Sequence, residues 1–180
     1  MDGARSCFQQ HGFHAAGTAE IAAAAKVSVA NLYQYFSSKD ELIIAIAEED
    51  LSSDLALLAM IKSAGSIERA IELAAEAIAH EASDPSVSRL RLEVSTEATR
   101  NPGVADVVHR AEQMQRAALE DWIRQSQARG EMPADLDPET SAFGLLCLID
   151  GAFARVATGA LAPDSAALEL MPAIRAMFRI

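Results

Sequence analysis

The 180-residue sequence has few aromatic residues (5%), only two cysteines and no long uncharged apolar run. Because no stretch of about 18 apolar residues is free of charge, we expect no membrane-spanning segment and no membrane partner. The N-terminus lacks a basic segment followed by an apolar run, so a signal peptide is not expected. Cys7 and Cys147 are too few for a disulfide framework, which favours a reducing, cytoplasmic compartment.

The residue patterns of enzymes and metal sites are absent as well. The Glu-x-x-His pairs that hold di-iron sites in helical bundles do not occur, and no glycine-rich phosphate loop is present. Glu76 and His80 are four residues apart but stand alone, so a surface pair is the simpler interpretation. Ser95 and Cys147 have no candidate base in the sequence. We therefore expect no enzymatic activity, no metal and no cofactor.

Charge is distributed unevenly along the chain. The net charge is −11; residues 1–40 hold three basic and three acidic side chains, whereas residues 41–180 hold 12 and 23. A strongly acidic protein is a poor partner for nucleic acid, since phosphates repel it. A neutral N-terminal segment on an acidic body is nevertheless compatible with phosphate contacts by that segment.

Helix-forming residues dominate what is present. Alanine and leucine supply most of the 51% of apolar residues, and both favour helix. No segment alternates as a strand does. Capping residues, prolines and glycines predict helices at about 4–11, 19–25, 29–36, 39–64, 67–82, 85–98, 102–129, 138–158 and 164–180. The sequence thus predicts an all-α fold of about nine helices, with a three-helix head (1–45) joined directly to a body (46–180).

The segment around residues 18–36 fits a helix-turn-helix, with Lys26-Val27-Ser28 as the turn. Leu32 and Phe36 share one face of the second helix and are expected to pack inward, together with Ile21 and Val27. The opposite face is polar; its hydroxyls can bond phosphates, and its amides can read adenine edges. This face holds Ser28, Val29, Asn31, Tyr33 and Gln34, and Lys39 at the next helix start forms a second phosphate site. On periodicity alone, the alternative that the tyrosines simply cap a small helical core is stronger.

The ordered string GFHAAGTAEIAAAAKVSVANLYQYFSSKDEL, residues 12–42, favours the first interpretation. It resembles the DNA-binding domain of the TetR/AcrR family of transcriptional regulators, and the segment 130–157 resembles the penultimate-helix region of many members. The resemblance implies that the third helix enters the major groove and that a homodimer reads a palindromic double-stranded operator. It also implies phosphate contacts by Thr18, Tyr33, Tyr35 and Lys39, and a body that binds a small effector.

Three departures from the family pattern stand out. Members usually carry several more residues before the first helix, whereas Met1 stands nearly at that helix here. Tyr35 stands where members often have His, and it keeps a donor that does not titrate near neutral pH. Ala30 stands where Gly is common, and its methyl group limits close approach to DNA.

The last two predicted helices carry more apolar surface than one chain was expected to cover. The helix at 138–158 is apolar on several sides and must be buried on more than one of them. Packing both helices against their symmetry mates predicts a four-helix dimer interface. The residues assigned to it are Phe153, Leu168, Met171, Ile174 and Phe178.

Alanines at 70, 74, 77, 111 and 118 predict a ligand pocket, because they leave room that larger side chains would fill. The expected lining is Leu73, Ala77, Leu90, Met114, Ala118, Trp122, Phe143 and Cys147, with His80 or Glu93 as polar groups. The alternative is that the alanines only let helices pack closely, and that His80 and Glu93 are solvated. Asp150 lies in the most apolar helix and needs a partner there; a bond to a neighbouring helix or to the other subunit is the favoured role.

Two functional hypotheses follow. The first is a homodimeric transcriptional regulator, a repressor released by a small apolar or amphipathic ligand. The second is a helical small-molecule-binding or interaction protein whose head no longer binds DNA. The charge of −11 and the short segment before the first helix motivate the second.

Overall fold

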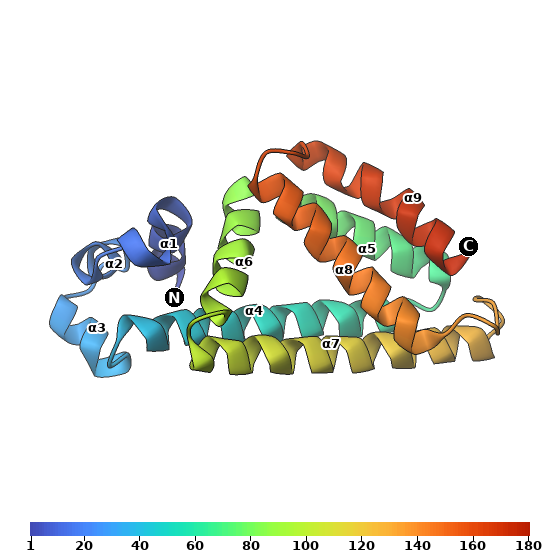
Figure 1. Ribbon diagram of the computed structural model, residues 1–180, viewed down its shortest axis with the longest axis horizontal. Coiled ribbons are helices and arrows are strands. Elements are labelled where there is room, and N and C mark those ends of the chain that lie inside the picture. Colours follow the sequence, from blue (N-terminus) through green and yellow to red (C-terminus); the bar gives the residue numbers. More distant parts are fainter.

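Every regular element of the protein is helical. The computed structural model describes all 180 residues and contains nine α-helices and one short 3-10 helix, with no strand (Figure 1). The α-helices are α1 (Asp2–Ala15), α2 (Thr18–Ala24), α3 (Val29–Tyr35), α4 (Lys39–Lys62), α5 (Ile67–Ala82), α6 (Pro85–Ala98), α7 (Pro102–Ala128), α8 (Pro138–Ala157) and α9 (Ala166–Phe178). The predicted all-α class and helix number are confirmed.

Short polar side chains set most of the helix starts. The residues whose side chains accept a bond from a first-turn N–H are Ser28, Ser38, Ser66, Asp84, Asn101 and Asp137. Such a cap contributes about 1 kcal/mol. The second helix begins at Thr18 and not at residue 19 as predicted, because Gly17 is the N-cap and its N–H donates to the Glu20 carboxylate at 2.9 Å. The last helix also starts later than predicted, since Pro163–Ser165 forms the 3-10 helix.

Gly12 bends the first helix instead of ending it. Its φ of 75° and ψ of 166° lie in a region that glycine alone adopts readily, and α1 resumes beyond it to Ala15. The bend brings Phe13 against Phe8, with the ring centroids 4.9 Å apart and the rings edge to face. Both rings are almost completely buried, so the bend closes the core of the head.

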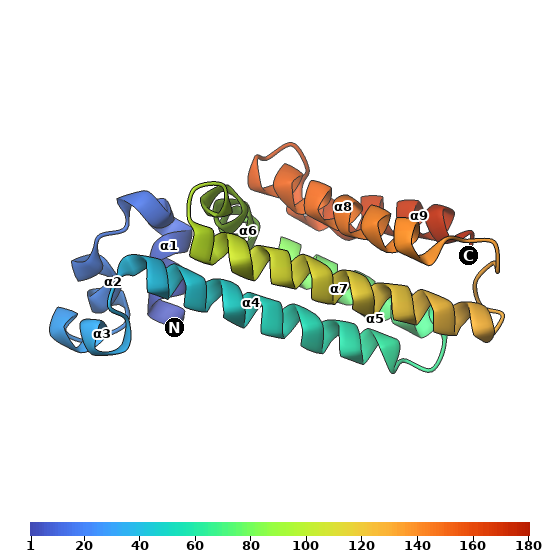
Figure 2. The ribbon, with the colours of Figure 1, turned by 60° about the horizontal axis from the view of Figure 1, so that its bottom comes forward.

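The core of the head includes residues from the body. Ile21, Leu32 and the start of α4 pack with Leu90 of α6 and Val104 of α7. Phe36 lies half-buried against this core as expected, but Val27 is exposed, which corrects its predicted inward position. In both ribbon views α4 and α7 run side by side along the molecule, and α6 crosses next to the head (Figures 1 and 2).

The body covers more of α8 and α9 with its own side chains than the sequence predicted. Phe153, Ile174 and Phe178 are buried within the chain, where the Phe178 ring meets the Trp122 ring edge to face at 5.8 Å. Other helices of the same chain already cover these side chains, so the expectation that one chain could not cover both helices is wrong. Their assignment to a dimer interface stays a prediction. Leu168 alone of the assigned residues is highly exposed, at 75%.

One helix, α8, is long and apolar enough to cross a membrane by length and composition. The core helix of a globular protein passes the same test, and α8 packs against α6, α7 and α9.

Two buried serines provide a matched test of core polarity. The Ser88 hydroxyl has no hydrogen-bond partner, whereas the equally buried Ser126 hydroxyl accepts from Arg129 at 3.1 Å. We expect Ser88→Ala to stabilise the fold by about 1 kcal/mol, which corresponds to about 2–4 °C in melting temperature. Ser126→Ala should lower the melting temperature instead. Thermal unfolding followed by circular dichroism measures both, and a loss of stability in Ser88→Ala would contradict the assignment.

Candidate functional site

The predicted recognition face lies on α3, at the end of the molecule farthest from the C-terminus (Figure 1). Its side chains point into solvent: Tyr33 is 48% exposed, Tyr35 is 77% exposed, and Val29 and Gln34 are also exposed. Large exposed aromatic rings on a short helix indicate a contact surface, because burial would otherwise stabilise them. The alternative in which both tyrosines cap the head core is therefore wrong.

Other residues in and next to this face also have structural roles. The Ser28 side chain accepts from the Asn31 N–H at 3.1 Å, which starts α3. Asn31 and Thr18 are half-buried, and Thr18 occupies the first turn of α2. Lys26 turns the chain between α2 and α3 with a φ of 57°. A non-glycine residue in this left-handed conformation costs about 1–2 kcal/mol, so the turn is held by its surroundings.

Lys39 caps the end of α1. Its ammonium donates to the backbone carbonyls of His14 at 3.3 Å and Ala16 at 3.4 Å. The side chain is half-buried and lies at the N-terminus of α4, the place where the sequence predicted a phosphate contact. A phosphate at this site would have to share the ammonium with two helix-end carbonyls.

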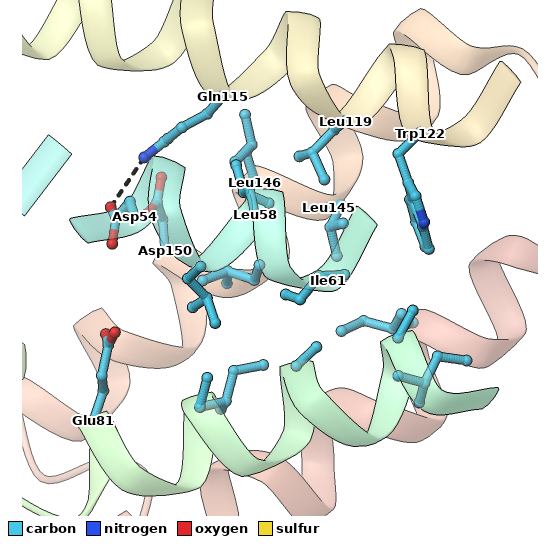
Figure 3. A pocket seen from close by; sticks show the side chains of 18 of the residues that line it. Asp54, Leu58, Ile61, Glu81, Gln115, Leu119, Trp122, Leu145, Leu146 and Asp150 are labelled. Atoms are coloured by element: carbon cyan, nitrogen blue, oxygen red, sulfur yellow. Dashed lines mark hydrogen bonds between the residues drawn. The ribbon is translucent and has the colours of Figure 1, made fainter. Parts of the chain in front are cut away.

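The body contains an apolar cavity of about 130 Å³. Its walls come from α4, α5, α7, α8 and α9, with a single residue from α6. Ala70, Ala74 and Ala77 line it together, so the alanine stripe of α5 leaves room as expected. Trp122 forms the wall at one end, and Leu58 and Ile61 of α4 lie between it and the polar end (Figure 3).

Most of the predicted lining lies elsewhere. Of the ten residues assigned to the pocket, only Ala77 and Trp122 line the cavity. Leu90 belongs to the head core, and the Glu93 carboxylate accepts from the Phe13 N–H at 3.3 Å. Phe143 is half-exposed beneath the Arg116 guanidinium, at 5.2 Å from the ring centre. The other five residues of the predicted lining also lie outside the cavity: Leu73, His80, Met114, Ala118 and Cys147. Three of them, His80, Met114 and Cys147, are exposed to solvent.

The cavity has a polar end that the sequence analysis missed. The Arg91 guanidinium donates to Asp54 at 2.8 Å and lies 3.2 Å from the Glu81 carboxylate and 5.0 Å from the Phe153 ring centre. The second oxygen of Asp54 accepts from the Gln115 amide at 2.9 Å (Figure 3). Asp150 lines the same end, but it makes no hydrogen bond or ion pair within the chain. Its favoured bond to a neighbouring helix is therefore not present.

Burial perturbs the acids of this end. It raises the pKa of Glu81, against the opposing effect of the Arg91 charge. It also raises the pKa of Asp150; the Arg91 charge opposes the shift, and the charges of Glu112 and Asp54 add to it. The surrounding protein therefore makes both carboxylates harder to ionise than in water, although the Asp150 residue remains exposed at the edge of the cavity.

Comparison with known proteins places the whole chain in one group. Residues 1–46 match the family model of bacterial regulatory proteins, tetR family, and residues 66–178 match that of the BetI-type transcriptional repressor, C-terminal. The transcriptional regulator UidR of Escherichia coli (strain K12) is 28% identical over 166 residues, which cover 92% of this chain and 83% of UidR.

Two solved structures extend the comparison. GusR of Salmonella enterica is 28% identical, with a TM-score of 0.76 over 99% of this chain and 93% of GusR. A TetR transcription regulator from Haloarcula marismortui has a TM-score of 0.86 over 99% of this chain and 93% of its own, at 20% identity, and so shows the shared fold.

Asp150 should cost stability at neutral pH. Because burial raises its pKa above that of the unfolded chain, the ionised form is disfavoured in the fold. We expect Asp150→Asn to raise the melting temperature at pH 7.5, and the gain to shrink as the pH falls toward the ordinary aspartate pKa of about 4. Calorimetry at several pH values measures this, with exposed Asp106→Asn as the control for removing one charge. An equal gain at all pH values would count against an unpaired carboxylate whose pKa is raised in the fold.

Proposed function

This chain belongs to the TetR family of bacterial regulatory proteins and is a DNA-binding transcriptional regulator, and from that premise we propose that it is a homodimeric repressor released by a small apolar or amphipathic ligand. The head binds a palindromic operator in the cytoplasm. The body binds the ligand and changes the position of the head. The observation that carries the proposal is that one helix, α4, both lines the cavity and forms part of the head core.

The two roles of α4 are carried by its two ends. Leu42 and Ile46 are buried in the head core, whereas Leu57, Leu58 and Ile61 line the cavity. A helix transmits a displacement along its length, because its backbone hydrogen bonds resist bending. A ligand that pushes against the cavity end of α4 therefore moves the head.

A second connection runs through α6. Arg91 lines the cavity, and Glu93 on the same helix accepts from the Phe13 N–H in the head. Arg5 of α1 adds ion pairs to Glu49 at 2.8 Å and Asp50 at 2.6 Å on α4. A ligand shifts the equilibrium between two head positions only by its difference in affinity for them, typically about 1–3 kcal/mol.

The exposed face of α3 is proposed to enter the major groove. Tyr33, Tyr35 and Lys39 supply donors to phosphates, together with the half-buried Thr18. The residues left for base edges are Ser28, Val29, Asn31 and Gln34. An α-helix fits this groove, and amide side chains can form paired bonds to adenine there.

The proposed dimer uses the faces of α8 and α9 that the chain leaves uncovered. Leu168 on α9 and Cys147 on α8 are exposed. A two-fold interface places the same patch of each subunit together, so modest apolar patches double in area. Two heads related by that axis would read two half-sites of a palindrome.

Substitutions in the head should separate phosphate from base contacts. We expect Lys39→Gln to weaken binding of all DNA sequences and to reduce the slope of log affinity against log salt by about 1, because one phosphate contact is lost. Glutamine keeps a donor for the α1 carbonyls, so the melting temperature checks the fold. Gln34→Ala should leave the salt slope unchanged and alter sequence preference. Fluorescence anisotropy with a duplex selected from random DNA measures both.

Two outcomes bear directly on the proposal. Wild-type affinity of Lys39→Gln at 150 mM salt, near physiological ionic strength, would remove Lys39 from the interface. Failure of the wild-type protein to select any duplex at any salt concentration would favour the alternative, a ligand-binding helical protein with a lost DNA-binding head.

The dimer should depend on Leu168. We expect Leu168→Glu to shift the protein from a dimer toward the 19.2 kDa monomer, because two buried charges would face each other across the axis. Met60→Glu, on an exposed site of α4, is the matched control and should remain dimeric. Light scattering coupled to size exclusion measures the mass at micromolar concentration. A wild-type protein that runs as a monomer would refute the homodimer.

A further inference from the structure

We propose that α3 reads A·T base pairs in the operator, with the Ala30 methyl group contacting a thymine C5-methyl group and the Gln34 amide binding a nearby adenine. This inference rests on the proposed function, because it takes α3 as the helix that enters the major groove, and it adds which bases that helix reads. The feature that carries it is an exposed helix face without any charged side chain, on which a methyl group and an amide lie one turn apart.

The recognition segment lacks the charged side chains that read G·C pairs. Residues 27–38 contain no Arg, Lys, Asp or Glu. In the major groove, Arg or Lys forms paired bonds to guanine O6 and N7, and Asp or Glu accepts from the cytosine N4 amino group. Asn and Gln instead pair with adenine N6 and N7, and small apolar groups contact the thymine methyl. The side chains that α3 does have therefore match the two bases of an A·T pair.

Ala30 and Gln34 form the outermost stripe of α3. Leu32 is buried in the head core, and a helix turns by about 100° per residue, so the residues two positions before and after it lie on the opposite side. Both are exposed. They lie about 6 Å apart along the helix axis, which corresponds to about two base-pair steps of roughly 3.4 Å. A duplex against this face would meet the methyl group and the amide within neighbouring base pairs.

Neither side chain is needed by the fold of the head. Gln34 takes part in none of the side-chain hydrogen bonds that hold the head, such as those of Ser28 and Lys39. The Ala30 methyl group belongs to neither hydrophobic core. Asn31 differs, because it is half-buried and its N–H donates to the Ser28 cap. Ala30 and Gln34 are therefore the groups of α3 most available to bases.

Further apolar side chains next to Ala30 remain in solvent. Val27 is 37% exposed and Val29 is 38% exposed. Such side chains gain free energy when another surface removes them from water. The C5-methyl group of thymine is the apolar group that base pairs present in the major groove. The apolar part of this face thus favours thymine over the polar edges of a G·C pair.

The cations of the head are mostly engaged within the protein. Arg5 pairs with Glu49 and Asp50 on α4. The Lys39 ammonium is bonded to two backbone carbonyls, which leaves Lys26 as the one exposed basic side chain of residues 1–40 without such a partner. Affinity that is independent of sequence depends on how many phosphates Lys and Arg neutralise. Base contacts therefore carry a larger share of the affinity here, and the loss of one methyl contact becomes measurable.

Deoxyuridine tests the thymine contact, because it lacks only the C5-methyl group of thymine. A duplex is selected from random DNA with the full-length protein, and each thymine of one half-site is replaced together with its equivalent in the other. We expect uracil at one or two positions to weaken binding about fourfold per half-site, the effect of one buried methyl group. Unchanged affinity with uracil at every position would overturn the proposal.

The variant Ala30→Gly assigns the contact to one side chain. Uracil should cost nothing further at the sensitive position in this variant, because the partner methyl group is already absent, whereas a purely structural role of Ala30 would weaken both duplexes equally. Ala56→Gly, at an exposed site of α4 outside the head core, is the matched control for lost helix propensity and should keep the wild-type uracil effect. A uracil effect that persists in Ala30→Gly but disappears in Val29→Ala would overturn the role of Ala30.

The base analogue 7-deazaadenine tests the Gln34 contact, because it lacks the N7 acceptor. At one adenine of each half-site it should weaken binding of the wild-type protein about fivefold, the effect of one hydrogen bond. The affinity of Gln34→Ala should be the same for both duplexes. Interference by 7-deazaguanine, together with no effect of 7-deazaadenine, would show that α3 reads guanine and would overturn the proposal.

These outcomes separate the proposal from the function on which it rests. Binding that is sensitive to 7-deazaguanine and insensitive to uracil keeps the DNA-binding regulator and refutes the reading of A·T pairs. Binding that is sensitive to uracil and 7-deazaadenine, to a duplex that no apolar compound releases, keeps the reading of A·T pairs and refutes ligand-controlled release. Failure to select any duplex at any salt concentration refutes both.

Discussion

The unbroken helix α4 is the constraint on which the rest of the structure depends. Ile46 near its start is completely buried among the residues of the head, and Ile61 near its end packs against the core of the body. Leu90 of α6 and Val104 of α7 enter the head core as well. The head is therefore not a module on a linker. Its position is set by the packing of helices that also form the cavity walls.

The ion pairs of the molecule differ in their surroundings, and the fold alone does not require this difference. Most ion pairs lie at the surface, where such pairs contribute little to stability. One exception is the group around Arg91, which packs against Phe153 at the edge of an apolar cavity. Charges in such a place cost free energy unless they are paired, so their retention is more readily explained by ligand binding than by stability.

Local signals predicted the fold well and the cavity poorly. Ser28, Ser38 and Ser66 act within one helical turn, so their capping roles could be predicted from the sequence alone. The same holds for the exposed face of α3. The cavity depends instead on which helix faces pack against one another in the folded chain. The alanine stripe of α5 and Trp122 indicated it, but Leu58 and Asp54 of α4 could not be assigned without knowing that α4 packs alongside α7. Glu93 was misassigned because only the bend of α1 brings the Phe13 N–H to it.

The bend at Gly12 has a consequence for how this sequence can change over evolutionary time. A Cβ atom there would lie 3.3 Å from the Glu93 carboxylate, in a backbone conformation that side chains rarely adopt. Gly65, Gly130 and Gly159 also have positive φ, but nothing lies within 4 Å of a Cβ added to them. Drift can therefore replace those three by asparagine at modest cost. Position 12 does not tolerate such a replacement, because any other residue would strain the backbone and would also disturb the contact between α1 and α6.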